Sequence, residues 1–177
     1  MDIFTVAERI KNDDKLAVLK TDTLYGLIGS AFSKTAVDKI YKIKKRNNTK
    51  PLIVLVANYN QLNLFNIPKL YINKSKQYWP GPYSLIMPVN NHNLSYLSNS
   101  GKIAFRLPDN SRLQTFIKIS GPIVAPSANP EGLTPAKNIS EAKNYFGVDV
   151  DYYIDDGTCE NSIPSKLIDL TTNQILR

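Results

Sequence analysis

The sequence predicts an α/β domain in which helices flank a twisted, mixed, open sheet. Short runs rich in Val, Ile and Leu, which are typical of buried strands, alternate along the chain with amphipathic segments of helical period. The 177 residues are 42% hydrophobic and 21% charged, which is enough for one domain with a true core. Because no internal repeat or linker-like change in composition divides the chain, we expect a single domain over residues 1–177.

Helices are predicted where apolar residues recur at helical spacing. Caps are predicted for two of them, from Asp109 or Asn110 and from Ser140, because these side chains can accept a bond from a first-turn N–H group. The helices are expected at 2–12, 34–45, 59–64, 69–78, 111–119 and 139–146.

Strands are predicted in the apolar runs between these helices, and two of them lead directly into polar residues. One runs into the polar turn 20–26, and another runs into Ser127-Ala-Asn129. Ligands of open α/β sheets commonly bind at such strand ends, although a turn of this kind can also bond its own backbone. The strands are expected at 16–19, 52–56, 85–89, 102–108, 122–126, 151–154 and 166–170.

The chain is basic, with a net charge of +7 and an isoelectric point of about 9.4. This excess argues for an anionic partner such as a nucleotide or RNA, with simple solubility as the alternative. A basic segment over 42–50 precedes the strand at 52–56, so its charges are anchored to the core. Arg offers a planar fork of donors and Lys a point charge, which suits a polyphosphate; a solvated charge run is the alternative.

Several classes of site are excluded by composition. The single cysteine, Cys159, excludes an intramolecular disulfide, and the single histidine, His92, leaves too few ligands for a zinc site of His and Cys. His92 lies in a polar stretch and is predicted to be exposed. The N-terminus lacks an apolar run after a basic start, and no apolar run approaches membrane-spanning length. We therefore expect no signal peptide, no membrane contact and a cytoplasmic location.

Polar side chains at the predicted strand ends could converge on one side of the sheet. The glycine-rich loops of known nucleotide sites are absent, so a phosphate site must be built from side chains. A basic pocket with hydroxyls but no strong nucleophile suits electrostatic and proximity catalysis on a phosphate ester. A basic groove that binds RNA without catalysis fits the same residues. The candidates are Lys44, Arg46, Lys50, Arg106, Thr23, Ser127 and Ser165.

Four separated motifs resemble the YrdC-type domain of the threonylcarbamoyl-AMP synthase family. They are K-T-D-T-L-Y-G-L at 20–27, K-K-R-N-N-T-K-P-L at 44–52, W-P-G-P-Y-S-L at 79–85 and P-S-A-N-P-E-G at 126–132. The resemblance runs in order through Arg106, Pro164-Ser165 and the terminal Ile175-Leu-Arg177, and it is to the short, single-domain form. It implies a YrdC/RibB-like fold with a basic concave groove.

The resemblance also implies a reaction and its partners. Family members join L-threonine, bicarbonate and ATP into threonylcarbamoyl-AMP and release pyrophosphate. Downstream transfer proteins then move the threonylcarbamoyl group to the adenosine beside the anticodon of tRNAs that read codons beginning with A. Contact with tRNA through the basic surface is implied as well. Mg²⁺ is the expected cofactor, held mainly by ATP, because the sequence offers no clear acidic cluster to bind a metal.

Residue by residue, the resemblance implies a phosphate half and a threonine half of the site. Lys44, Arg46 and Lys50 would hold the ATP phosphates, and the first two would also be catalytic, since basic groups stabilise charge as pyrophosphate leaves. Thr23 and Arg106 would hold threonine, because a guanidinium suits bidentate binding of its carboxylate.

On the facing loop, Ser127 and Asn129 would hold the nucleotide, with Ser165 nearby. The sequence departs from the family's usual residues at four positions. Lys20 stands where Pro is common, Ser84 and Lys166 stand where Thr is common, and Glu131 stands where Ser is common.

Overall fold

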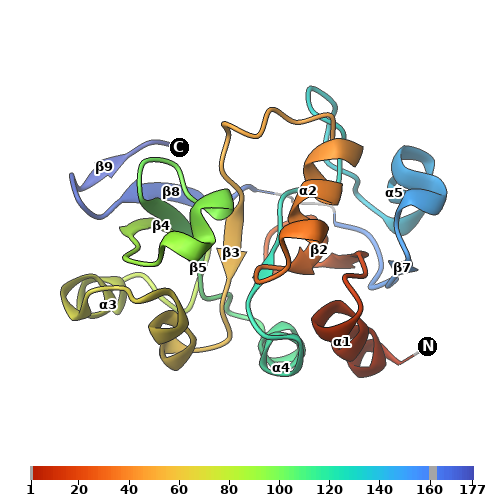
Figure 1. Ribbon diagram of the computed structural model, residues 1–177. Helices are drawn as coiled ribbons and strands as arrows, with labels where there is room; N and C mark the ends of the chain where they lie inside the picture. Colours follow the sequence, from red (N-terminus) through yellow and green to blue (C-terminus); the bar gives the residue numbers. More distant parts are fainter. Residues whose placement is uncertain (1, 160–162) are drawn as a thin grey trace.

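The computed structural model describes residues 2–159 and 163–177, and it confirms a mixed sheet flanked by helices (Figure 1). The strand order is β7-β1-β2-β6-β3-β5-β4-β8-β9, with parallel and antiparallel neighbours. The strands are β1 (Ala17–Lys20), β2 (Tyr25–Ser30), β3 (Ile53–Leu55), β4 (Tyr83–Pro88), β5 (Lys102–Arg106), β6 (Ile123–Val124), β7 (Tyr152–Tyr153), β8 (Lys166–Asp169) and β9 (Gln174–Ile175).

Helices cover both faces of the sheet because side chains along each strand alternate between the faces. The helices are α1 (Ile3–Asn12), α2 (Lys34–Ile43), α3 (Lys69–Ser75), α4 (Ser111–Ser120) and α5 (Ile139–Phe146), with 3₁₀ turns at Tyr59–Phe65, His92–Leu97 and Gly147–Asp149. Ala17 and Leu19 pack in one hydrophobic cluster with α1 and α4, whereas Leu16 and Val18 pack in another with α2 and α5. Figure 1 shows these two helix pairs on opposite sides of the sheet.

Strand β2 corrects the expectation of a polar turn that continues through residues 20–26. All residues of β2 are buried, and it lies between β1 and β6, so its sequence shows no alternation of polar and apolar residues. Two glycines also weaken its strand signal. A side chain at Gly29 would bring a Cβ within 3.0 Å of Ile40 Cδ1 on α2, so the glycine is what allows this helix to pack closely.

Other local expectations have mixed outcomes. Asn110 caps α4 as predicted, but α5 is capped by Asn138 and not by Ser140. His92 is exposed as predicted, although a 3₁₀ turn begins there. Over the described ranges, no helix combines the length and the apolar character that a bilayer crossing requires.

Candidate functional site

A pocket opens where the β1–β2 turn, the end of β5 and the segment after β6 meet. Its wall contains Thr21, Thr23, Leu24, Tyr25, Gly26, Arg46, Ile53, Arg106, Ala125, Pro126, Ser127, Pro135, Pro164, Ser165 and Arg177. The predicted site residues that line it are Thr23, Arg46, Arg106, Ser127 and Ser165. Those that lie outside its wall are Lys44, Lys50 and Asn129.

The segment after β6 reaches the pocket because it continues to pair with β2. Leu27 N donates to Pro126 O at 2.8 Å, and Ala128 N donates to Tyr25 O at 2.8 Å. At Gly26, between these two bonds, a Cβ would lie only 3.2 Å from the Thr21 methyl carbon. A glycine here therefore lets the β1–β2 turn and the segment 125–128 approach each other.

The polar turn after β1 bonds its own backbone and also lines the pocket. Thr21 Oγ1 donates to Leu24 O at 2.7 Å and accepts from the backbone N–H groups of Thr23 and Leu24, each at 3.2 Å. These bonds make a rigid turn, as Asx- and ST-type turns do. They hold Thr23 at the pocket, 3.2 Å from Thr21 between the two hydroxyl oxygens.

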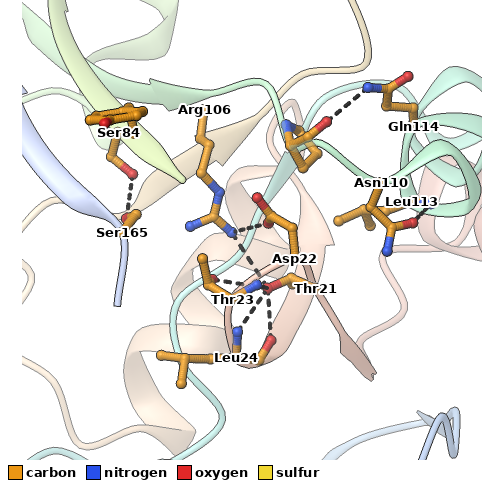
Figure 2. A network of polar contacts seen from close by, with 12 residues as sticks. Thr21, Asp22, Thr23, Leu24, Ser84, Arg106, Asn110, Leu113, Gln114 and Ser165 are labelled. Carbon is orange, nitrogen blue, oxygen red and sulfur yellow. Dashed lines mark hydrogen bonds and ion pairs between the residues drawn. The ribbon is translucent and has the colours of Figure 1, made fainter. Parts of the chain in front are cut away.

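Arg106, the last residue of β5, brings a buried positive charge to the pocket wall. Its side chain is 5% exposed, and its Nη2 lies 3.0 Å from Oδ1 of Asp22, whose side chain is 7% exposed (Figure 2). Burial raises the pKa of Asp22 and the Arg106 charge opposes that rise, whereas burial lowers the pKa of Arg106 and Asp22 opposes the fall. The sequence placed a carboxylate in this turn, but it did not indicate that Asp22 is the counter-ion of Arg106.

Ser165 is held from two sides. Its Oγ lies 2.7 Å from Oγ of Ser84 on β4, and both serines are buried (Figure 2). Nη2 of Arg177 donates to Ser165 O at 3.1 Å, and Nε donates to the same oxygen at 3.2 Å. Arg177 also lines the pocket, and its charge lowers the pKa of Arg106. Arg177 matched the family pattern in the sequence, but nothing local marked it as a pocket residue.

Lys44 is buried and holds the loop that follows β6. It follows α2 as the C-cap residue, is 2% exposed, and its Nζ donates to the backbone oxygens of Ser127 and Asn129, each at 2.5 Å. Burial is the main reason that its pKa is lowered to about 8. The ammonium thus holds the loop after β6 and does not lie in the pocket wall.

The side chain of Asn129 also closes this loop. Its Oδ1 accepts from Ser127 Oγ at 2.6 Å, and its Nδ2 donates to the backbone oxygens of Pro130 and Leu133 at 2.9 and 2.8 Å. The amide therefore uses both of its ends within the segment 127–133, where it orients the Ser127 hydroxyl that lines the pocket.

Glu131 joins the basic loop to the loop after β6. Its carboxylate accepts from Lys50 Nζ and, at 3.3 Å, from the backbone N–H of Asn47, and the Lys50 bond lowers the pKa of Glu131. Its own N–H donates to Lys44 O at 2.7 Å. Arg46 lies against the same loop, with Nε 3.3 Å from Lys50 O, and turns its side chain to the pocket.

The pocket is therefore lined by cations and hydroxyls. Three guanidinium groups line it, those of Arg46, Arg106 and Arg177. Among the described residues, no acidic side chain lines the pocket. Such a wall suits a carboxylate or a phosphate. Within the same described part of the chain, no group of three or more His, Cys, Asp or Glu side chains could hold a metal ion.

Two curated relatives cover most of this chain. A threonylcarbamoyl-AMP synthase from Pyrococcus abyssi is 31% identical over 94% of the chain, which spans only about half (50%) of that relative's length. A threonylcarbamoyl-AMP synthase from Cellvibrio japonicus is 30% identical over 89% of the chain and 85% of the relative.

Solved structures share the fold. The crystal structure of P. abyssi Sua5 complexed with L-threonine has a TM-score of 0.84 and 30% identity, over 96% of this chain and 51% of that one. E. coli YciO has a TM-score of 0.85 at 21% identity, over 99% of this chain and 87% of that one, and shows the fold alone. A family model described as "Sua5_yciO_yrdC: Telomere recombination" matches residues 9–177. The chain belongs to the Sua5/YciO/YrdC family.

Proposed function

We propose that this protein makes threonylcarbamoyl-AMP from L-threonine, bicarbonate and ATP and releases pyrophosphate. The observation that carries the proposal is the pocket wall, in which guanidinium groups and hydroxyls from distant segments meet around one opening. The activity named for the P. abyssi and C. japonicus relatives supports the same reaction.

The threonine half of the site is assigned to Arg106 and Thr23. A guanidinium fixed in a buried wall pairs well with a carboxylate, because its donors are planar and match the two carboxylate oxygens. Thr23 also lines the pocket, and its hydroxyl oxygen is 3.2 Å from that of Thr21, which in turn lies 3.5 Å from Nη2 of Arg106. The complex of P. abyssi Sua5 with L-threonine supports an amino-acid ligand for this fold.

The nucleotide half is assigned to Arg46, Ser127 and Ser165 in the wall, with Lys44 and Lys50 behind and beside it. Arg46 is the phosphate ligand for which the geometry is best, because it is half-buried and already turned to the pocket. Lys44 contributes charge from behind the loop, and direct contact with phosphate would require it to leave the backbone oxygens of Ser127 and Asn129.

The chemistry follows from positioning and charge. The threonine amine adds to the carbon of bicarbonate, which yields a carbamate and water, or to CO₂, which yields a carbamate and a proton. A carbamate oxygen then attacks the α-phosphorus of ATP, and the bond to the β-phosphate oxygen breaks as pyrophosphate leaves. Arg46 and its neighbouring cations stabilise the developing negative charge, and Arg106 keeps the amine near the nucleotide.

The proposed function also includes Mg²⁺ as the cofactor, contact with tRNA and a cytoplasmic location. Mg²⁺ usually binds substrate phosphates with one or two protein carboxylates at most, so ATP can bring it to a site without an acidic cluster. When bound, the ion neutralises phosphate charge. Contact of the basic surface with tRNA, delivery of the product to the transfer proteins and a cytoplasmic location complete the proposal.

The test is pyrophosphate release by the purified protein with ATP, Mg²⁺ and bicarbonate, with and without L-threonine. We expect release that depends on threonine, together with a new adenylate seen by rapid chromatography. Arg46→Ala should reduce this turnover by at least about 100-fold while the circular dichroism spectrum is kept, since removal of one charge-stabilising donor commonly has an effect of this size. Arg9→Ala, which removes an exposed arginine of α1, is the matched control.

Other outcomes would change the assignment. Folded wild-type protein that binds ATP but releases no pyrophosphate would contradict the synthase. Steeply salt-dependent tRNA binding without any turnover would favour the RNA-binding module instead.

A further inference from the structure

Arg106 is incompletely bonded within the described residues, and its ion-pair partner Asp22 is not part of the pocket wall. Among the described residues, its Nη2 has two neighbours, Oδ1 of Asp22 at 3.0 Å and Oγ1 of Thr21 at 3.5 Å. Its Nε is buried without a hydrogen-bond partner in that part of the chain. Figure 2 shows the contacts of the guanidinium gathered on one nitrogen. A buried N–H group without a partner is unfavourable, and the described protein groups do not use the full bonding capacity of this side chain.

Asp22 lies behind Arg106, so its effect on a ligand in the pocket passes through Arg106. Its carboxylate is more than nine-tenths buried and is not part of the pocket wall, whereas Arg106 is. A second cation, Arg177, lies close enough to Arg106 to disfavour its charge. The Asp22 charge therefore offsets both the cost of burying the guanidinium and this repulsion. Without it, the burial of a charged Arg106 in the wall would be uncompensated.

The geometry of the pair also leaves Arg106 free to turn. Nη2 and Oδ1 are 3.0 Å apart, and the charge of Arg106 is the main influence that opposes the raised pKa of Asp22. Attraction between charges depends weakly on orientation, whereas a hydrogen bond weakens steeply when it is bent. Arg106 can thus turn toward an incoming carboxylate while its charge stays attracted to that of Asp22.

We propose that Asp22 is a positioning residue for substrate binding. It keeps Arg106 charged, in the pocket wall and under-bonded, so that the guanidinium completes its hydrogen bonds only when the carboxylate of the amino acid arrives. This rests on the proposed function and deepens it, because it names the group that prepares Arg106 for threonine. Asp22 itself does not touch the substrate.

The test is the kinetics of Asp22→Asn, which keeps the shape of the side chain and removes its charge. We expect the KM for L-threonine to rise about tenfold or more, as is typical when a supporting partner is lost. At saturating threonine, kcat should stay within about threefold, and the KM for ATP should not change, because Asp22 acts on carboxylate binding alone. Asp22→Glu, which restores the charge, should recover most of the threonine KM.

The controls separate positioning from folding. Asp38→Asn removes one partner of the exposed Lys34–Asp38 pair on α2 and should leave both KM values unchanged. A purely structural role for Asp22 would lower the melting temperature and the active fraction, and hence kcat, with the threonine KM intact. An unchanged or lower threonine KM in Asp22→Asn would overturn the proposal, since a more positive pocket would then bind the carboxylate at least as well.

A measurement on the wild type keeps the proposal testable if Asp22→Asn does not fold. The Nε–H resonance of Arg106, identified by its absence in Arg106→Lys, should shift when L-threonine is added. If it does not move while threonine binds, the proposal is wrong. Failure of the proposed function is distinct from this, because the folded wild type would then show neither threonine-dependent turnover nor a threonine-induced rise in melting temperature.

Discussion

Two ion pairs of the candidate site lie in opposite surroundings, one behind the pocket wall and the other between two loops beside it. Asp22 and Arg106 have side chains that are 7% and 5% exposed, whereas Lys50 and Glu131 are 58% and 29% exposed. Water screens the second pair and side-chain motion weakens it, so its net contribution to stability is small. The first pair lies where an unpaired charge is costly. Burial, more than the chemistry of the partners, therefore decides which pair the protein depends on.

Removal of Arg106 is expected to have the largest effect. Arg106→Ala leaves the Asp22 carboxylate buried without a counter-charge, and we expect the free energy of unfolding to fall by about 3–5 kcal/mol. Threonine-dependent pyrophosphate release should be lost as well. Urea denaturation and turnover assays measure the two effects. The double variant Asp22→Asn with Arg106→Ala should regain part of the stability, and a double variant no more stable than Arg106→Ala would argue against the buried pair.

Lys44 differs from both pairs, because it is a buried cation whose hydrogen bonds go to backbone oxygens. Its pKa falls from 10.5 to about 8 in the folded protein. Between these pH values the unfolded chain holds the proton and the folded protein does not, so the free energy of unfolding rises with pH across this window. The cost of burying the charge applies in full below pH 8 and amounts to about 3 kcal/mol.

The measurement is urea denaturation of the wild type and of Lys44→Met from pH 7 to pH 10. The stability of the wild type relative to Lys44→Met should increase over this range by up to about 3 kcal/mol. Lys45→Met, which removes an exposed lysine from the same loop, controls for the change in net charge. A flat difference between the wild type and Lys44→Met would show that Lys44 is not buried as a cation in solution.

The smallest effect is expected at the exposed pair. Glu131→Gln should leave the melting temperature unchanged, because the pair that it removes is largely in water. It should lower the KM for ATP, by no more than about threefold, since Lys50 is then free to meet phosphate. Asp38→Asn is again the matched control. A clear loss of stability in Glu131→Gln would mean that this residue braces the two loops and does not merely compete for Lys50.

Local patterns in the sequence correctly predicted structural features that depend on residues close together in the sequence. Helix α1 lies within the predicted range 2–12, and Asn110 caps α4, because helical period and capping involve residues within one or two turns. The strand β2 was missed for the converse reason. It is buried on both faces by helices and strands that come from elsewhere in the chain, so its own sequence carries no alternation.

The candidate site divides in the same way. Ser127 and Arg106 followed from polar or charged residues at strand ends, and both line the pocket, while their roles in binding stay predictions. Arg177 was not assigned a role, because only the pairing of β8 with β9 brings it back to Ser165. The contacts of Lys44 with the loop after β6 could not be predicted from local sequence either, since they join residues 83 and 85 positions apart.

The sequence indicates which groups are available: a basic chain, hydroxyls and arginines at strand ends, one cysteine, one histidine and the order of the motifs. The tertiary structure alone decided which of those groups are buried, and hence which charges are held by a partner. Asp22 meets Arg106 because β1 and β5, though separated in the sheet, both end at this pocket. The energy of a charge depends on the water around it, and that water is removed only when distant segments pack together.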